Sequence, residues 1–300
     1  MEPSYRRASR EGLLKDKVAE ARRLLEHCSA CPRCCGVNRL RGEAGFCRIG
    51  RAARVASFGP HFGEEDVLVG RYGSGTVFFS GCNLRCVFCQ NADISAFDEG
   101  QEVGAEELAG IMMSLQRNRC HNINLVSPSH QVPQIIEALH IAAARGLSIP
   151  IVYNTGGYDS TAVIDLLDGL VDIYMPDIKY SDEAVAGRLS AAPDYPSVVR
   201  AAVRIMHEQV GDLVVDSDGV AVRGLIVRHL VLPGGLAGTA GVMRFIAEEI
   251  SRNTYINIMA QYHPAHRAHQ YPPLEKPLEP KEHEEALAIA RSFGLWRFAR

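Results

Sequence analysis

The sequence lacks three features that would place it in a broad class at once. No run approaches the ~18 apolar residues of a membrane-spanning helix. The formal net charge is −3, so the chain lacks the basic field that drives nucleic-acid binding. The basic stretch YRRASR near the N-terminus has no apolar segment after it, as a secretory signal would have. We therefore expect a cytoplasmic protein that binds neither nucleic acid nor a membrane.

Cysteine, by contrast, is abundant and clustered. Five of the nine cysteines lie between positions 28 and 47, three lie between positions 82 and 89, and Cys120 stands alone. Clustered thiols in a reducing compartment bind metal or do chemistry more often than they form disulfides. Cys120, at the start of a predicted strand, is expected to be a small buried side chain.

From about residue 74 onward, apolar segments with strand character alternate with helix candidates. Strands this apolar are typical of a parallel sheet that helices cover on both sides. Six strand–helix units fit an incomplete barrel or a doubly wound open sheet, and periodicity alone does not separate the two. Both architectures gather functional residues at the carboxyl ends of the strands. The predicted strands start near residues 76, 122, 149, 171, 224 and 255, and an inserted hairpin is predicted to turn at Asp218 and Gly219.

The stretch SGCNLRCVFCQN follows the first predicted strand directly. It holds Cys82, Cys86 and Cys89 in a C-x3-C-x2-C spacing. A structural zinc site closes with four ligands, and ferredoxin-type clusters also use four cysteines. Three thiolates therefore need either a distant fourth ligand or a coordination position left open. A cuboidal cluster with one bare iron could chelate a small molecule through an amine and a carboxylate.

This spacing, with Phe88 before the last cysteine, resembles the radical S-adenosylmethionine (radical SAM) superfamily. The resemblance implies an α/β fold with a partial (β/α)6 barrel, and a 4Fe–4S cluster on Cys82, Cys86 and Cys89. It also implies that S-adenosylmethionine binds the fourth iron and is cleaved by one electron to a 5′-deoxyadenosyl radical, which abstracts hydrogen. A flavodoxin- or ferredoxin-type protein would donate the electron.

Later motifs resemble the glycyl-radical-enzyme activating group, which includes the pyruvate formate-lyase activating enzymes. They are CVFCQN, YNTGGY, MPDIKY, VRHLVLPGG and QYHPAH. The resemblance implies that residues of these motifs, and of VSPSHQ after the second strand, contact S-adenosylmethionine. The implied contact residues are Asn91, Ser127, Asn154, Thr155, Asp177, Lys179, Arg228 and His263.

Several of these residues also have an ordinary structural interpretation. Asp177 and Lys179 lie two apart on one strand face and could pair with each other. His263 could be a hydrogen-bonded structural histidine. Val231 and Leu232, which the resemblance implies line the adenine, could be core residues. The segment VSPSHQ also replaces the family's usual Gly-Gly-Glu, which leaves the substrate open.

The resemblance extends from about residue 28 to residue 298 and points to an uncharacterised subgroup described as homologues of the pyruvate formate-lyase activating enzyme. The expected function is therefore hydrogen abstraction from a protein or peptide substrate. Action on a small metabolite, or methyl transfer, is the alternative within the same chemistry. A non-catalytic iron–sulfur electron carrier or a zinc-binding interaction protein is the alternative from another class.

The N-terminal cysteines form a second candidate metal site. Cys28, Cys31, Cys35 and Cys47 are spaced C-x2-C-x3-C-x11-C. Both zinc and an auxiliary iron–sulfur cluster accept four thiolates, and the spacing does not choose between them. Cys34 is the spare thiol of this segment.

The chain is expected to divide into three parts. His61, Glu64 and Glu65 in the loop GPHFGEED could line the mouth of the active site, but a solvated loop is the expectation. The parts are an N-terminal helix with the Cys-rich metal-binding segment (1–70), the radical SAM core barrel (71–270) and a C-terminal closing helix (271–300).

Overall fold

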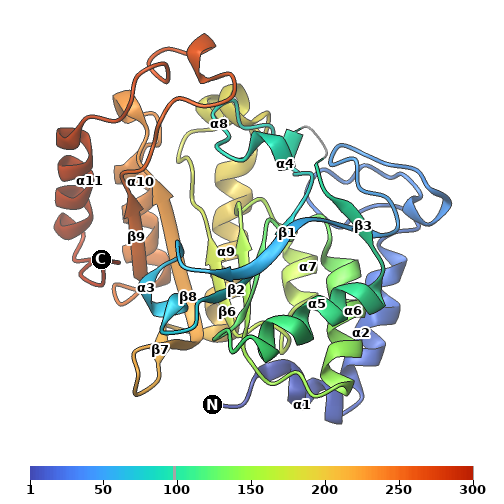
Figure 1. The fold of residues 1–300 in the computed structure, drawn as a ribbon. Coiled ribbons are helices and arrows are strands. Elements are labelled where there is room, and N and C mark those ends of the chain that lie inside the picture. The colour runs from blue at the N-terminus through green and yellow to red at the C-terminus, as the bar shows by residue number, and fades with distance from the viewer. Residues whose placement is uncertain (97–98, 300) are drawn as a thin grey trace.

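The computed structural model describes residues 1–96 and 99–299, and in this part of the chain one mixed sheet organises the fold (Figure 1). Residues 97 and 98 of the expected core barrel, and Arg300 of the expected closing helix, lie outside the described residues. The strands are β1 (Ala53–His61), β2 (Ser74–Phe79), β3 (Gln101–Val103), β4 (Ile123–Val126), β5 (Ile151–Thr155), β6 (Ile173–Pro176), β7 (Val214–Val215), β8 (Ala221–Leu230) and β9 (Tyr255–Met259).

Six of these strands run parallel in the order β2, β4, β5, β6, β8 and β9. They correspond to the six strands predicted from the sequence. At one edge β1 pairs antiparallel with β2, and β3 pairs antiparallel with β1. Within the described residues no ladder joins β9 back to β2, so the six strands form an incomplete barrel. The predicted hairpin is β7–β8, where Gly219 has a φ of +78°.

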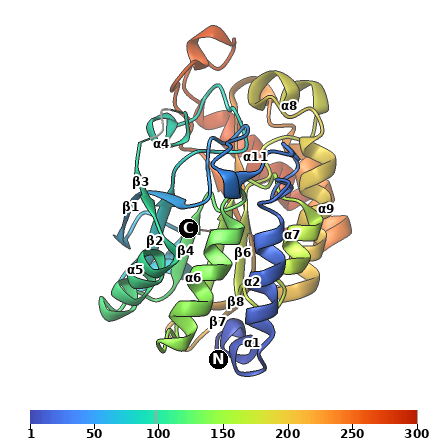
Figure 2. The ribbon, with the colours of Figure 1, turned by 90° about the vertical axis from the view of Figure 1, so that its right-hand side faces the viewer.

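Helices connect consecutive parallel strands and cover the outside of the sheet (Figures 1 and 2). This alternation is what a parallel sheet requires of its crossovers. The helices are α1 (Ser4–Arg10), α2 (Leu13–Arg23), α3 (Asp66–Val69), α4 (Ala92–Ala96), α5 (Ala105–Arg117), α6 (Val132–Ala144), α7 (Thr161–Leu166), α8 (Glu183–Ser190), α9 (Tyr195–Val210), α10 (Thr239–Phe245) and α11 (Pro280–Ser292), with short turns η1 (Arg39–Arg41), η2 (Pro233–Gly235), η3 (Ile246–Ile250) and η4 (Ala268–Gln270).

Alternate residues of the parallel strands enter two separate apolar clusters. On β6, Tyr174 joins the large cluster that includes the covering helices, whereas Ile173 and Met175 join a small cluster that contains no residue of α5, α6, α7 or α9. The period of two follows from strand geometry, so the small cluster fills the inside of the barrel. We call it the inner cluster; it consists of Leu68, Val152, Ile173, Met175, Leu213, Ala221 and Ile226.

Strand β1 and helix α3 were not predicted from the sequence. In Figure 1, β1 crosses the front of the sheet and leads to α3 beside β8. Leu68 of α3 is fully buried in the inner cluster, and the Asn122 side chain donates a hydrogen bond to its carbonyl oxygen (2.9 Å). The segment after β1 therefore contributes to the inside of the barrel.

The N-terminal helices lie on the outside of the barrel, where α2 packs against α6. The Ser4 backbone N–H donates to Asp172 (2.7 Å) and the Tyr5 hydroxyl donates to the Ile149 carbonyl oxygen (3.0 Å). These bonds tie the start of the chain to the amino ends of β5 and β6. None of the helices in the described ranges has the length and apolar character needed to cross a bilayer.

Candidate active site at the carboxyl ends of the strands

The strand register places a polar layer directly above the inner cluster. Asn154, Asp177 and Arg228 each lie two residues beyond an inner-cluster member on β5, β6 and β8. Because strand side chains alternate, all three point to the same interior, one layer nearer the carboxyl ends. In the same region the backbones of Asp177 and Arg228 are paired by a parallel bridge. The sequence therefore builds an apolar base and a polar top inside one barrel.

The three clustered cysteines stand on the loop that follows β2. The Leu84 backbone N–H donates to the Cys82 sulfur (3.4 Å), while the Cys86 and Cys89 sulfurs lie 3.0 Å and 3.2 Å from the hydroxyls of Ser190 and Ser95. Within the described residues, no three His, Cys, Asp or Glu side chains converge as the ligands of a single ion. A four-iron cluster does not require its cysteines to converge on one ion, because each thiolate binds a different iron.

The three thiols also affect one another electrostatically. Burial raises the pKa of the Cys82 thiol to about 12; Cys86 and Cys89 add to the rise, and Lys179 opposes it. Metal ligands of this kind bind as thiolates. The site therefore suits a group whose positive irons stabilise three neighbouring thiolates in a buried setting.

One cavity of about 250 Å³ joins the cysteine loop to the polar layer. Its wall also contains apolar side chains, among them Phe79, Leu230 and Met259. Of the residues singled out in the sequence, it is lined by Cys82, Cys86, Cys89, Asn91, Ser127, Asn154, Thr155, Asp177, Lys179 and Arg228.

A network of charges occupies one wall of this cavity. Asp177 accepts hydrogen bonds from Lys179 Nζ (2.6 Å) and Arg228 Nε (2.8 Å), and Arg228 also donates to Asn154 Oδ1 (2.7 Å). Burial alone would raise the pKa of Asp177, but the two cations outweigh it and the pKa is lowered. The pairing of Asp177 with Lys179 that the sequence allowed is therefore present. Asp177 thereby keeps both Lys179 and Arg228 in the wall of the cavity.

Two acidic residues that the sequence analysis placed in a solvated loop are buried instead. Glu64 lies 3.6 Å from Arg228 Nη1 and 3.5 Å from the Asn154 side-chain nitrogen. Glu65 is 7% exposed and accepts a hydrogen bond from Asn257 of β9 (2.9 Å). The expectation was wrong because a short loop has no periodicity to reveal burial. Only its distant partner Arg228 could have signalled the role of Glu64.

Other predicted contact residues differ in placement. Ser127 lines the cavity in a left-handed backbone conformation (φ +57°). The Thr155 hydroxyl donates to the buried carboxylate of Asp159 (2.6 Å), so it orients the turn after β5. His263 is exposed, is not part of the lining, and lies 3.2 Å from the side chain of the lining residue Gln90.

In the motif VRHLVLPGG, Arg228 and Leu230 line the cavity, whereas Val231 and Leu232 are buried core residues. Among the N-terminal cysteines, Cys28, Cys31 and Cys47 are buried, Cys35 is half-buried and Cys34 is exposed.

Comparison with known proteins identifies the class. The sequence profile of the radical SAM superfamily matches residues 76–217. The uncharacterized protein MJ0674 of Methanocaldococcus jannaschii is 33% identical over 292 residues, which cover 94% of this chain and 80% of that protein. The chain belongs to the radical SAM superfamily, which is a superfamily of enzymes.

A solved structure shares the fold, and a second one shows a weaker similarity. A radical SAM methyltransferase from Sphaerobacter thermophilus has a TM-score of 0.52 at 18% identity, covering 76% of this chain and 67% of that one. A structure described as native anSMEcpe with bound AdoMet has a TM-score of 0.48 at 12% identity, covering 71% and 58%.

Membership implies a 4Fe–4S cluster and S-adenosylmethionine, and the residues present fit both. Three half-buried thiols share one cavity, as a cluster with an open coordination position requires. Lys179 and Arg228 provide cations on the facing wall, and these suit a carboxylate. Asn154 and Ser127 bring polar groups to the same space.

Proposed function

We propose that this enzyme cleaves S-adenosylmethionine reductively and abstracts hydrogen from a protein or peptide substrate, as the glycyl-radical-enzyme activating enzymes do. The observation that carries the proposal is the single cavity shared by the cysteine loop and the Asp177–Lys179–Arg228 network. The motifs CVFCQN, YNTGGY and MPDIKY support the activating type, because their residues meet at that cavity.

The size of the cavity favours a substrate that inserts only a part of itself. Ligand pockets usually measure roughly 300–1,000 Å³, and this one measures about 250 Å³. The cluster and S-adenosylmethionine must both be accommodated in this cavity, because its wall includes Cys82, Cys86 and Cys89. A reactive backbone or side-chain position on a larger substrate could reach the remaining space, whereas a whole metabolite would need more room.

The protein residues have defined tasks in this reaction. When bound, the cluster supplies the electron for reductive cleavage. Lys179 and Arg228 bind the carboxylate of the methionyl part, and Asp177 fixes the direction of both cations. The apolar wall that includes Phe79 and Met259 excludes water from the reacting carbon. We propose that a flavodoxin- or ferredoxin-type protein reduces the cluster and that the reaction takes place in the cytoplasm.

The radical chemistry is tested by product formation. Protein reconstituted anaerobically with iron and sulfide should form 5′-deoxyadenosine when given dithionite and S-adenosylmethionine. A Cys86→Ala variant should form none, while Cys120→Ala, which changes a buried cysteine that does not line the cavity, should retain activity. An intact cluster that forms no 5′-deoxyadenosine would overturn the proposal.

The substrate class needs a separate measurement. A deuterated glycyl-radical protein should transfer deuterium to 5′-deoxyadenosine and acquire a glycyl radical signal in electron paramagnetic resonance. Deuterium that arrives only from a small metabolite, or product that carries a new methyl group, would instead favour the alternative within the same chemistry.

A further inference from the structure

Four N-terminal thiols lie in one folded segment that the proposed reaction does not use: backbone bonds pair Cys28 with Gly36 and Val37, and the Phe46 amide donates to the Cys35 sulfur. Burial raises the pKa of Cys31 to about 12, and its neighbours Cys47 and Cys28 add to the rise. The pKa of Cys47 is raised by burial and by Cys28 and Cys35. Cys34 is exposed, has a positive φ of 41°, and its sulfur lies 3.5 Å from the Cys31 carbonyl oxygen. The four cysteines that the spacing indicates are all less exposed than Cys34.

The backbone around these thiols repeats a feature of the cluster loop. The Leu84 amide donates to the Cys82 sulfur (3.4 Å), and the Phe46 amide donates to the Cys35 sulfur (3.4 Å). Amide donors to sulfur favour the thiolate over the thiol, and hydrogen bonds to cluster sulfurs tune their potential. The two segments therefore share one way of stabilising a thiolate ligand.

A buried cation supplies an independent reason for negative charge in this segment. Arg39 is 1% exposed, its Nη1 lies 4.0 Å from the Cys28 sulfur, and its Nη2 has no hydrogen-bond partner. Its other bonds go to the carbonyl oxygens of Gly50 and His130. Within residues 1–96 and 99–299 no carboxylate forms an ion pair with it. A buried charge without a counter-charge is costly, and a metal held by four thiolates carries net negative charge.

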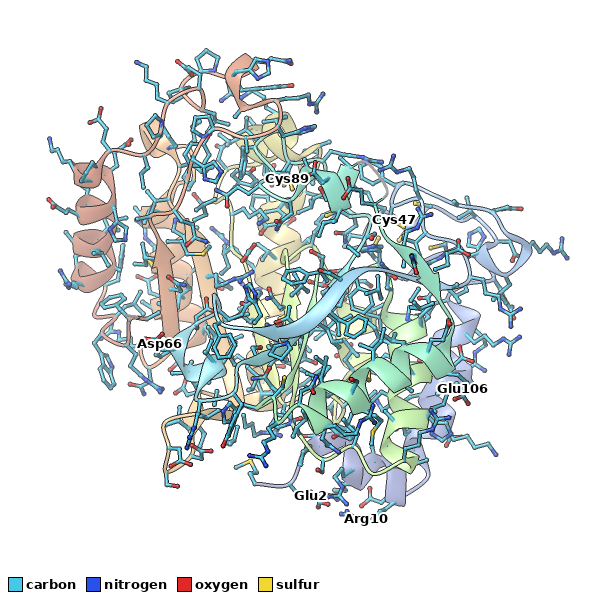
Figure 3. All side chains as sticks on the ribbon, viewed as in Figure 1. Glu2, Arg10, Cys47, Asp66, Cys89 and Glu106 are labelled. Atoms are coloured by element: carbon cyan, nitrogen blue, oxygen red, sulfur yellow. The ribbon has the colours of Figure 1, made fainter. Side chains whose placement is uncertain are left out.

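The N-terminal segment touches the loop that carries Cys82. A Cβ atom on Gly81 would lie 2.6 Å from the Cys47 carbonyl oxygen, so only glycine fits beside it. Arg33 Nε donates to the Asn83 carbonyl oxygen (2.8 Å). Figure 3 places Cys47 and Cys89 at the same end of the molecule, opposite Glu2 and Arg10. The residues on both sides of Cys82 thus rest on the N-terminal segment.

We propose that Cys28, Cys31, Cys35 and Cys47 bind a second metal centre, an auxiliary iron–sulfur cluster whose thiolates each hold a different iron, that keeps the radical SAM cysteine loop in place. Its negative charge pairs with Arg39. Its ligand turns support Gly81 and Asn83 on either side of Cys82. The proposal does not depend on which substrate the enzyme uses.

Metal content of the intact protein gives the first test. The superfamily cluster accounts for about four irons per chain. A second cluster would add iron and sulfide to that number and would support the proposal. About one zinc ion per chain in place of the added iron would overturn the assignment to a cluster. Reconstituted, folded protein with about four irons and no zinc would overturn it.

Variants separate the two sites. A Cys82→Ala, Cys86→Ala, Cys89→Ala triple variant should keep the second metal although it cannot form 5′-deoxyadenosine, so this result does not depend on the radical chemistry. Adding Cys31→Ser should remove that metal, whereas Cys34→Ser, a matched change in the same segment, should not. Equal metal loss in both variants would contradict the assignment of ligands.

The supporting role is tested in the otherwise native chain. Cys47→Ser should lower iron occupancy of the Cys82, Cys86 and Cys89 site several-fold and change its electron paramagnetic resonance spectrum. Cys34→Ser should leave both unchanged. A Cys47→Ser protein that loses the second metal but keeps full occupancy and an unchanged spectrum at the first site would rule out the supporting role.

Discussion

At the scale of single residues, Asp177 is the anion that pairs with both cations of the cavity wall. Its two carboxylate oxygens accept hydrogen bonds from Lys179 and Arg228, and all three side chains are largely buried. Removing the shared anion would leave two buried cations without their main partner. Breaking a buried pair of this kind typically costs about 3–5 kcal/mol.

We therefore expect Asp177→Asn to lower the free energy of unfolding by about 3 kcal/mol. Because Lys179 and Arg228 would no longer be held in one direction, affinity for S-adenosylmethionine should fall at least about ten-fold. Urea unfolding and equilibrium binding measure the two effects. Asp218→Asn makes the same chemical change in the exposed β7–β8 turn and should alter neither. Unchanged affinity in Asp177→Asn would show that the network does not contact the ligand.

At the scale of elements, the sequence could predict strands that the core requires but not those at the edge. The segments that became β4, β5 and β6 are short apolar runs, and burial on both faces demands that composition. β1 contains Gly59 and Pro60 and exposes Phe58. It owes its conformation to pairing with β2, a tertiary contact that no local pattern contains.

The turn after β5 joins the cysteine loop to the charge network. Gly157 has a φ of +81°, and a Cβ atom there would lie 2.3 Å from the Asp177 carbonyl oxygen. Gly169 has a similar φ of +72° but no atom within 4 Å of such a Cβ. The two glycines share the backbone strain that an alanine would bring and differ in the space around them.

We expect Gly169→Ala to lower the free energy of unfolding by about 1–2 kcal/mol, the strain of a left-handed alanine. Gly157→Ala should cost about 1–3 kcal/mol more, because overpacking is added to strain. It should also weaken S-adenosylmethionine binding by displacing Asp177. Urea midpoints of the two variants measured side by side provide the test. Equal destabilisation would mean that the turn can move away from Asp177.

At the scale of the whole molecule, the sequence predicted what local motifs encode and missed what long-range contacts create. The cavity residues were found because each stands at a strand end within a motif of its own. Glu64 was missed because its partner Arg228 lies on a strand far along the chain. The sequence also did not reveal that the Arg39 side chain is buried, because the burial of a side chain depends on every element packed around it.

Acid stability is a property of the whole fold that two buried histidines influence. Burial lowers the pKa of both His130 and His229 to about 4. His229 bonds to the Ile178 carbonyl oxygen (2.7 Å) and the Thr239 hydroxyl (3.0 Å), as a neutral imidazole can. Asp177 raises the pKa of His229 and Lys179 lowers it, so their effects on this group oppose each other.

Between pH 6.5 and about pH 4 the unfolded chain binds protons at these histidines and the folded chain does not. The stability they contribute is therefore complete above pH 6.5 and is lost as the pH falls toward 4, by up to about 1.4 kcal/mol per pH unit for each histidine. We expect His229→Asn to reduce that slope by the contribution of one proton, whereas His269→Asn, at an exposed position, should leave it unchanged. Urea unfolding at a series of pH values measures the slope. If wild type and His229→Asn lose stability in parallel over this range, His229 is protonated in the folded protein and its buried neutral state is refuted.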